Sequence, residues 1–408
     1  MSKRILVSGL GFGGLARETS YCLADDETNQ SYGKVKMATV ALIHLLHKVR
    51  QIPYPKLVIL LGTKQSEEIY RYLEDELAPL GIELKLIPYS LGLTKEELRH
   101  TVVELLNEIP PKCYLTVDLT HGLRHLPFLF FVAIQYLTVL RPKAEIDGVY
   151  YAMFRQGERV NPIVNLKLLL EFMEWIYAIR VFKDTRVAAN LSHCLAHITE
   201  DKDTKQVRKL LDDFSRGFSL ALPLQMGTSA AGLKDCLDDI SGAIADEVLL
   251  GKELFGEIRT LASEFAFDQD NVLDQPLKEP ELDRQARIID SYLATGQLSS
   301  GIGLIREWMV SAYMLHNNRA PAWRGKDRRQ IIPSQLGNLA AEDYEVGLAW
   351  GKVRDWRNEL AHHGMEKTAP AEIDIDIRDI KTQWNTLKKA SPIVNFGAET
   401  KNKRGKLR

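Results

Sequence analysis

Residues 3–14 read KRILVSGLGFGG, in which a short apolar run leads directly into a cluster of glycines. Arg4–Ser8 is typical of a buried β-strand, because it is a brief aliphatic run bounded by a turn signal. The turn that follows, Gly9–Gly14, matches the pattern G-x-G-x-x-G. Glycines at these positions let the backbone approach a phosphate group closely. The stretch therefore predicts a strand followed by a turn of the nucleotide-binding kind.

Strand-like and helix-like segments alternate downstream of this turn. Predicted strands cover 57–61, 82–87, 113–119, 148–154 and 160–166, and predicted helices cover 35–50, 67–80, 95–109 and 126–140. Such alternation favours right-handed crossovers and a mostly parallel sheet with helices on both faces. Ligands bind to such sheets beyond the carboxyl ends of the strands. We therefore expect an α/β domain over residues 1–165.

The pattern changes after residue 165, where long amphipathic stretches dominate. Helical periodicity covers 168–181, 187–198, 233–261, 284–293, 302–315 and 348–360, and loops are predicted at 265–282 and 317–335. The fold class expected for the whole chain is thus α/β plus all-α. The second domain would span residues 166–408, with 200–280 as a candidate helical insertion.

The composition sets limits on the class of protein. The chain has 408 residues, 45% of them hydrophobic and 26% charged, which excludes a disordered or collagen-like protein. The formal net charge of −1 argues against constitutive binding of polyanions. The charge is uneven, however: +1 over 1–165, −8 over 166–305 and +6 over 306–408. Chemistry on phosphate groups is therefore expected near the C-terminus.

Cysteine spacing and hydropathy indicate the compartment. The four cysteines, Cys22, Cys113, Cys194 and Cys236, form no C-x-x-C pair, which argues against a zinc or redox motif and fits a reducing compartment. The most apolar run, 127–140, is shorter than the roughly 20 residues of a membrane span. The N-terminus lacks the apolar stretch of a signal peptide. We expect a cytoplasmic protein with no membrane partner.

The glycine turn supplies the first candidate ligand site. A dinucleotide-binding turn of this pattern also needs an acidic residue at the end of the next strand, and the predicted strand ends instead in Leu61-Gly-Thr-Lys64. A turn that binds another nucleotide phosphate and a purely structural tight turn both remain open. The candidate contacts are Gly9, Leu10, Gly11, Phe12, Gly13 and Gly14.

A second candidate site lies where the strand 113–119 meets the helix 126–140. The segment reads VDLTHGLRHLP over 117–127. Hydroxyl, imidazole and guanidinium groups at the start of a helix suit an anionic ligand, and the candidates are Thr120, His121, Gly122, Arg124 and His125. In the alternative interpretation, Asp118 or Thr120 only caps the helix and His121 is a buried histidine with its hydrogen bonds satisfied. Proximity of the glycine turn on the same sheet edge favours a shared pocket.

Arg357 and His362 form the single Arg-x4-His match in the chain, within the basic C-terminal part, with Asn358 between them and His363 adjacent. Val353, Trp356 and Leu360 predict the buried stripe of this helix. On a continuous helix, Arg357 and His362 would lie about 140° apart, so the helix must end near Gly364 or a second subunit must complete the site. The alternative is an arginine on a solvated face and a histidine favoured by the helix dipole.

Taken together and in this order, these motifs resemble the CRISPR-associated ribonucleases of type III systems that join a CARF sensor domain to a HEPN nuclease domain. Asp118-Leu-Thr-His-Gly122 also matches the D-x-T-H-G motif that names one branch of that family. The resemblance to the sensor covers about residues 1–165. The nuclease is matched only by its motif and its helical character, and residues 200–280 have no counterpart that we can assign.

The resemblance implies a Rossmann-like sensor that binds a cyclic oligoadenylate, with the tetra-adenylate ring favoured, across the two-fold axis of a homodimer. The glycine turn and the Thr120–His125 segment would contact the ring, with Thr63 and Lys64 as further candidates. The helical domain would cut single-stranded RNA without a metal or cofactor, through Arg357, Asn358 and His362. Slow cleavage of the activator by the sensor is a further property to test.

RNA carries its own nucleophile, the 2′-hydroxyl, so the protein need only move protons and stabilise charge. A histidine suits general acid–base work near neutral pH, and an arginine offers a permanently charged fork for the phosphorane oxygens. Two other classes stay open at this point. One is a nucleotide-sensing regulator without nuclease activity, and the other is a nicotinamide-dependent enzyme, which the missing carboxylate disfavours.

Overall fold

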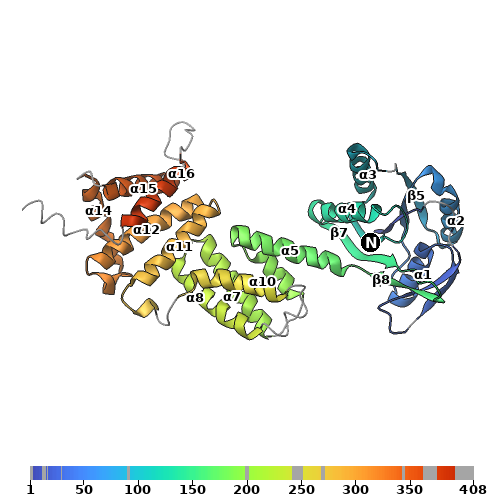
Figure 1. The fold of residues 1–408 in the computed structure, drawn as a ribbon, viewed down its shortest axis with the longest axis horizontal. Coiled ribbons are helices and arrows are strands. Elements are labelled where there is room, and N and C mark those ends of the chain that lie inside the picture. Colours follow the sequence, from blue (N-terminus) through green and yellow to red (C-terminus); the bar gives the residue numbers. More distant parts are fainter. Residues whose placement is uncertain are drawn as a thin grey trace, which may run out of the picture. The chain divides into compact units, whose positions relative to one another are not determined.

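The computed structural model describes residues 3–11, 15, 17–28, 30–89, 92–197, 202–240, 251–267, 272–341, 345–361 and 375–390. The chain divides into two compact units, Met1–Phe172 and Met173–Arg408. The sequence-based boundary at 165–166 falls directly after the last strand of the first unit. The first unit is α/β and the second is built of helices (Figure 1). Each is described separately.

An eight-stranded sheet forms the first unit. Its strands are β1 (Lys3–Gly9), β2 (Thr19–Leu23), β3 (Ser31–Val35), β4 (Leu57–Gly62), β5 (Glu83–Pro88), β6 (Lys112–Asp118), β7 (Lys143–Ala152) and β8 (Val160–Asn165). Their order is β3-β2-β8-β7-β6-β1-β4-β5. All neighbours are parallel except the pairs β2–β3 and β7–β8. The expected mostly parallel sheet is confirmed, and β1 lies between β4 and β6.

Helices cover both faces of this sheet: α1 (Ala38–Arg50) and α2 (Glu67–Leu77) on one, α3 (Lys95–Glu108) and α4 (Leu126–Leu140) on the other (Figure 1). Side chains of β1 alternate between the two. Leu6 packs in the cluster of α1 and α2, while Ile5 and Val7 pack in the cluster of α3 and α4. Every residue of β4 is buried. Burial on both faces explains why these strands read as continuous apolar runs.

Strands β2 and β3 were not predicted, and they change the meaning of the glycine turn. In a dinucleotide-binding unit, the turn leads directly into a helix whose N-terminus receives the phosphates. Here the chain runs from the turn into β2 and β3 at the far edge of the sheet, and α1 begins only at Ala38. The literal G-x-G-x-x-G match therefore lacks the helix of the dinucleotide fingerprint as well as its carboxylate.

The second unit is all-helical, as expected. Its elements are α5 (Leu168–Thr185), which begins in the first unit, α6 (Ala189–Ala196), α7 (Lys202–Ser219), α8 (Pro223–Ile240), α10 (Gly251–Phe265), α11 (Glu279–Ala294), α12 (Leu298–His316), α13 (Lys326–Gln330), α14 (Ile332–Ala341), α15 (Glu345–Ala361) and α16 (Ile377–Ala390). The prediction of a loop over 317–335 is wrong for the second half of that range, because α13 and the start of α14 lie there. The single helical pattern read over 233–261 is divided between α8 and α10, and residues 241–250 lie outside the described part.

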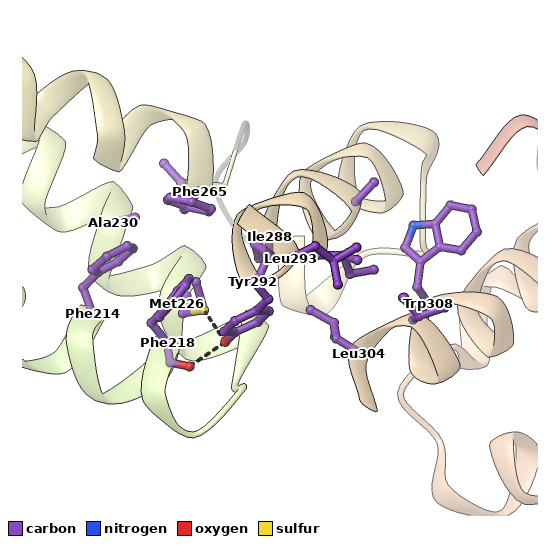
Figure 2. Close-up of a cluster of buried hydrophobic side chains, with 14 of the residues drawn as sticks. Phe214, Phe218, Met226, Ala230, Phe265, Ile288, Tyr292, Leu293, Leu304 and Trp308 are labelled. Carbon is purple, nitrogen blue, oxygen red and sulfur yellow. Dashed lines mark hydrogen bonds between the residues drawn. The ribbon is translucent and has the colours of Figure 1, made fainter. Parts of the chain in front are cut away.

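One hydrophobic core extends from α5 to α16. Tyr292 of α11 lies at the centre of the part shown in Figure 2, with Phe218 and Met226 on one side and Leu304 on the other. Its hydroxyl donates a hydrogen bond to the Phe218 carbonyl over 2.5 Å, and burial raises the pKa of the phenol. Helices from the 200–280 region thus share a core with α15, which carries Arg357.

Candidate functional site

The carboxyl ends of β1, β4 and β6 meet at one edge of the sheet, and Asp118 organises this edge. Its carboxylate is buried, and it accepts hydrogen bonds from the Thr39 hydroxyl over 2.6 Å and the Ser8 hydroxyl over 3.1 Å. Its second oxygen accepts the Thr120 amide over 2.9 Å. One carboxylate therefore joins the end of β1, the first turn of α1 and the loop after β6. This loop, residues 119–125, is called the 119–125 loop below.

Thr120 and His121 also use their polar atoms within the protein. The Thr120 hydroxyl accepts the Ala152 amide at the end of β7 over 2.9 Å. His121 Nε2 accepts the Ala38 amide over 3.1 Å, at the N-terminus of α1. Because Nε2 accepts a hydrogen bond there, the ring is neutral with its proton on Nδ1, and burial lowers the pKa of His121. His121 thus caps α1, whose N-cap residue Met37 has no side chain able to do so.

Two glycines allow the 119–125 loop to lie against the end of β1. A Cβ at Gly9 would be 2.5 Å from the His121 carbonyl oxygen. Gly122 has φ of +109°, and a Cβ there would be 2.5 Å from Leu126 Cδ1. Close packing within the protein therefore accounts for glycine at positions 9 and 122. At these two positions the contacts favour a structural role over a ligand-binding one.

The glycine turn continues along the same edge. The Leu10 amide donates to the Leu61 carbonyl over 2.8 Å, and the Ser66 hydroxyl donates to the Gly11 carbonyl over 3.1 Å. Thr63 accepts the Gln65 amide and begins a short 3-10 turn, so its hydroxyl has a capping role. Among the described residues, a Cβ at Gly11 would meet no atom within 4 Å. Phe12, Gly13 and Gly14 lie outside the described residues.

Two cationic side chains of this edge are exposed, Lys64 and Arg124. Among the residues that the structure describes, neither forms a hydrogen bond or an ion pair. His125 contacts the Tyr89 hydroxyl through Nε2, and Tyr89 lies just past the end of β5. The edge thus presents two unpaired positive charges beside open backbone at Gly11, an arrangement that attracts an anion.

Arg357 and Asn358 lie on the exposed side of α15, and Arg357 Nη1 donates to Asn358 Oδ1 over 3.3 Å. Val353 is buried, and Trp356 and Leu360 pack partly buried against the core, so the predicted stripe is present. His362 and His363 follow the last described residue of α15 and lie outside the described part. The structure therefore places the arginine and the amide, and it leaves the pairing with His362 as a prediction.

Three residues of the sheet edge had escaped the sequence analysis: Ser8, Thr39 and Tyr89. Ser8 and Thr39 are both fully buried beside Asp118. A serine at the end of an apolar strand and a threonine at the start of an apolar helix were the available signals. Within the described ranges, no group of three or more histidine, cysteine, aspartate or glutamate side chains is placed to hold a metal.

Comparison with known proteins gives three findings. No family model matches the chain. The CRISPR-associated protein MJ1674 of Methanocaldococcus jannaschii is 25% identical over 141 residues, which is 33% of this chain and 21% of that protein, so the match spans about a fifth of the relative's length. The structure of Enterococcus italicus Csm6 bound to cyclic hexa-2′-fluoro-hexa-dAMP aligns with 96% of this chain and 94% of its own, with a TM-score of 0.39 and 11% identity.

None of the described helices combines the length and apolar character needed to cross a bilayer. The central strands of the α/β unit end at a polar edge where Lys64 and Arg124 are exposed. The helical unit exposes Arg357 next to Asn358. In a stretch that makes up 33% of its length, the chain is similar in sequence to a CRISPR-associated protein.

Proposed function

We propose that this chain is a CRISPR-associated ribonuclease that cuts single-stranded RNA when its α/β unit binds a cyclic oligoadenylate, with the tetra-adenylate ring as the first candidate. The observation that carries the proposal is the sheet edge at which the 119–125 loop meets the glycine turn. Asp118 holds the D-x-T-H-G segment against the end of β1, and Lys64 and Arg124 stand exposed beside it. The sequence similarity to a CRISPR-associated protein supports the same assignment.

The chemistry of this edge favours a phosphodiester ligand over a neutral one. Lys64 and Arg124 supply charge, and no described atom lies within 4 Å of a Cβ built at Gly11. Arg124 precedes α4, so a phosphate near it also benefits from the positive end of that helix dipole. Because the polar atoms of Asp118 and most of those of Thr120 and His121 are already used, these residues would shape the loop, and the cations would make the electrostatic contacts.

In the helical unit, Arg357 would stabilise the charge that builds on the phosphorane oxygens, and His362 would transfer protons to and from the ribose oxygens. Asn358, which accepts from Arg357 Nη1, would orient the guanidinium. No step in this scheme needs a metal or cofactor. A homodimer in the cytoplasm, with the ligand across its two-fold axis, completes the proposal.

The deciding experiment incubates labelled single-stranded RNA with the protein and with cyclic tri-, tetra- or hexa-adenylate, with and without EDTA. The proposal requires cleavage that depends on one ring size and persists in EDTA, and that is lost in the Arg357→Ala variant. Tight binding of a ring without any RNA cleavage would instead identify a nucleotide-sensing regulator. Chromatography of the activator after incubation shows whether the ring itself is cut.

A further inference from the structure

Two histidines lie one turn apart at the C-terminal end of α6: His193 is in the helix, and His197 is the residue that caps it. His193 and His197 are both exposed, and their Nε2 atoms lie 3.2 Å from each other. The rings meet edge to face, with centroids 4.5 Å apart. Histidines at positions i and i+4 of a helix are a recurrent way to present two imidazole nitrogens to one metal ion.

The backbone that holds this pair is fixed by the core. Leu191, Cys194 and Leu195 face inward from α6 and are buried in the main cluster of the helical unit. The Ser192 hydroxyl donates to Asp212 Oδ1 of α7 over 2.6 Å, which anchors the same helix from its side. With the inner face packed, the backbone at the two histidines is fixed on the solvent side, so only their side chains have to be ordered when they bind an ion.

The spacing of the two nitrogens matches metal coordination. Imidazole nitrogens bind Zn²⁺ at about 2.0–2.1 Å. Two nitrogens 3.2 Å apart would then subtend about 100–106° at an ion equidistant from both. That angle lies between the right angle of an octahedral ion and the tetrahedral angle. The two Nε2 atoms share a hydrogen bond in the structure and the rings meet edge to face, so an ion would replace the shared proton and the rings would turn until both lone pairs point at it.

We propose that His193 and His197 bind one divalent transition-metal ion of the class Cu²⁺, Ni²⁺ and Zn²⁺ through their Nε2 atoms. Imidazole suits these ions, whereas Mg²⁺ and Ca²⁺ take oxygen ligands. Across the described ranges no third histidine, cysteine or carboxylate completes a larger group. The ion joins residues 193 and 197 across the last turn of α6 and stabilises the folded helix by mass action.

This site is independent of the proposed function. It uses α6 and not α15, and it takes part in no step of RNA cleavage. Its test therefore reads metal binding directly. A result against the metal site leaves the nuclease proposal untouched, and failure of the nuclease proposal leaves the metal site untouched.

The experiment titrates the untagged full-length chain with Cu²⁺ and records electron paramagnetic resonance spectra. Wild type should bind one more Cu²⁺ per chain than the double variant His193→Gln/His197→Gln, and the lost signal should show coupling to two nitrogens. The matched control is His100→Gln, since His100 is also an exposed helical histidine but has Glu104, not histidine, four residues later. It should bind Cu²⁺ as wild type does.

A second readout uses Zn²⁺ and thermal unfolding. Zn²⁺ should raise the Tm of wild type and of His100→Gln, leave that of the double variant unchanged, and Mg²⁺ should shift none of them. The proposal is overturned if the double variant retains the full Cu²⁺ stoichiometry with the same nitrogen coupling. It is equally overturned if His100→Gln loses as much binding as the double variant. Circular dichroism of the variants confirms that α6 still folds, because both substitutions are on the exposed face.

Discussion

The backbone of Gly9 lies so close to the carbonyl oxygen of His121 that a Cβ at residue 9 would be 2.5 Å from it. Strand β1 and the 119–125 loop are therefore in direct backbone contact at the sheet edge. This contact makes the first glycine of the turn a packing residue. At Gly11, two positions on, a Cβ would have no neighbour within 4 Å in the part of the chain that the structure describes. The same substitution to alanine should therefore change stability differently at the two positions.

Gly9→Ala should destabilise the protein by about 1–3 kcal/mol, because the added methyl group must displace a loop that is held by Asp118. Gly11→Ala should leave stability within about 0.5 kcal/mol of wild type, since its methyl group enters open space. If the turn contacts a ligand through open backbone, Gly11→Ala should weaken binding of the cyclic oligoadenylate without loss of fold. Urea unfolding and calorimetric titration measure the two effects. Equal stability of the two variants would contradict the packing argument.

Asp118→Ala should be among the most destabilising polar substitutions in the α/β unit. It would leave the buried hydroxyls of Ser8 and Thr39 and the Thr120 amide without their acceptor, and hydrogen bonds to a charged group are worth about 1.5–3 kcal/mol each. We expect a loss of at least about 2 kcal/mol in the free energy of unfolding. Asp75→Ala on the exposed face of α2 is the control and should change stability little. A near-neutral Asp118→Ala would show that the network does not hold the edge together.

Stability should depend on pH through His121. Burial lowers the pKa of His121 in the folded protein, so the unfolded chain binds its proton first as the pH falls. The free energy of unfolding should therefore decrease as the pH is lowered through about 6.5, by at most about 1.4 kcal/mol per pH unit for this one group. His121→Gln, which keeps a side-chain acceptor near the Ala38 amide, should show a shallower decrease between pH 7.5 and 5.5. The pKa of His44 is also lowered by burial, so the comparison of the two slopes, not the wild-type slope alone, tests the assignment.

The sequence predicted the sheet where burial on both faces left an unmistakable pattern. Strand β4 is buried throughout and was found within one residue of its end, and α4 was found with its bounds. Strands β2 and β3 were missed because they are short, mixed in polarity and at or near an edge, with no period that separates them from a loop.

The site was harder to predict than the sheet, because its hydrogen bonds join distant parts of the chain. Asp118 is 79 residues from Thr39 and 110 from Ser8, and no local pattern links them. The D-x-T-H-G letters drew attention to the 119–125 loop, yet they could not show that Thr120 and His121 already have partners inside the protein. Only packing in three dimensions shows which polar side chains of this edge already have partners inside the protein, and which, like Lys64 and Arg124, are exposed.

Arg124→Glu should raise the concentration of cyclic oligoadenylate needed for activation, because it replaces an exposed positive charge with a negative one where the ring phosphates would lie. Its RNA cleavage without activator should equal that of unliganded wild type, since Arg124 is far in sequence from the nuclease motif. Arg99→Glu, an equally large charge change on the exposed side of α3, is the control and should respond as wild type does. Activation curves of RNA cleavage measure all three proteins. An unchanged response of Arg124→Glu would show that the ligand does not occupy this edge.

The last prediction concerns the Arg-x4-His motif proposed to cleave RNA, of which the structure places Arg357 and Asn358 on the exposed side of α15. His362→Ala should lower the rate of RNA cleavage by about 10²–10⁴-fold, the usual worth of general acid–base catalysis. The His362→Ala/His363→Ala double variant tests whether the neighbouring histidine substitutes for part of that loss.

Mixing Arg357→Ala chains with His362→Ala chains then tests whether the site is shared between two subunits. If each site takes its arginine from one chain and its histidine from the other, the mixed dimer has one site with both residues intact and recovers activity that neither parent shows. If both residues of a site come from one chain, every site in the mixed dimer is broken and no activity returns. Sedimentation of the wild type tests whether the protein is a dimer at all. A monomer that cleaves RNA at full rate would contradict a site completed by a second copy.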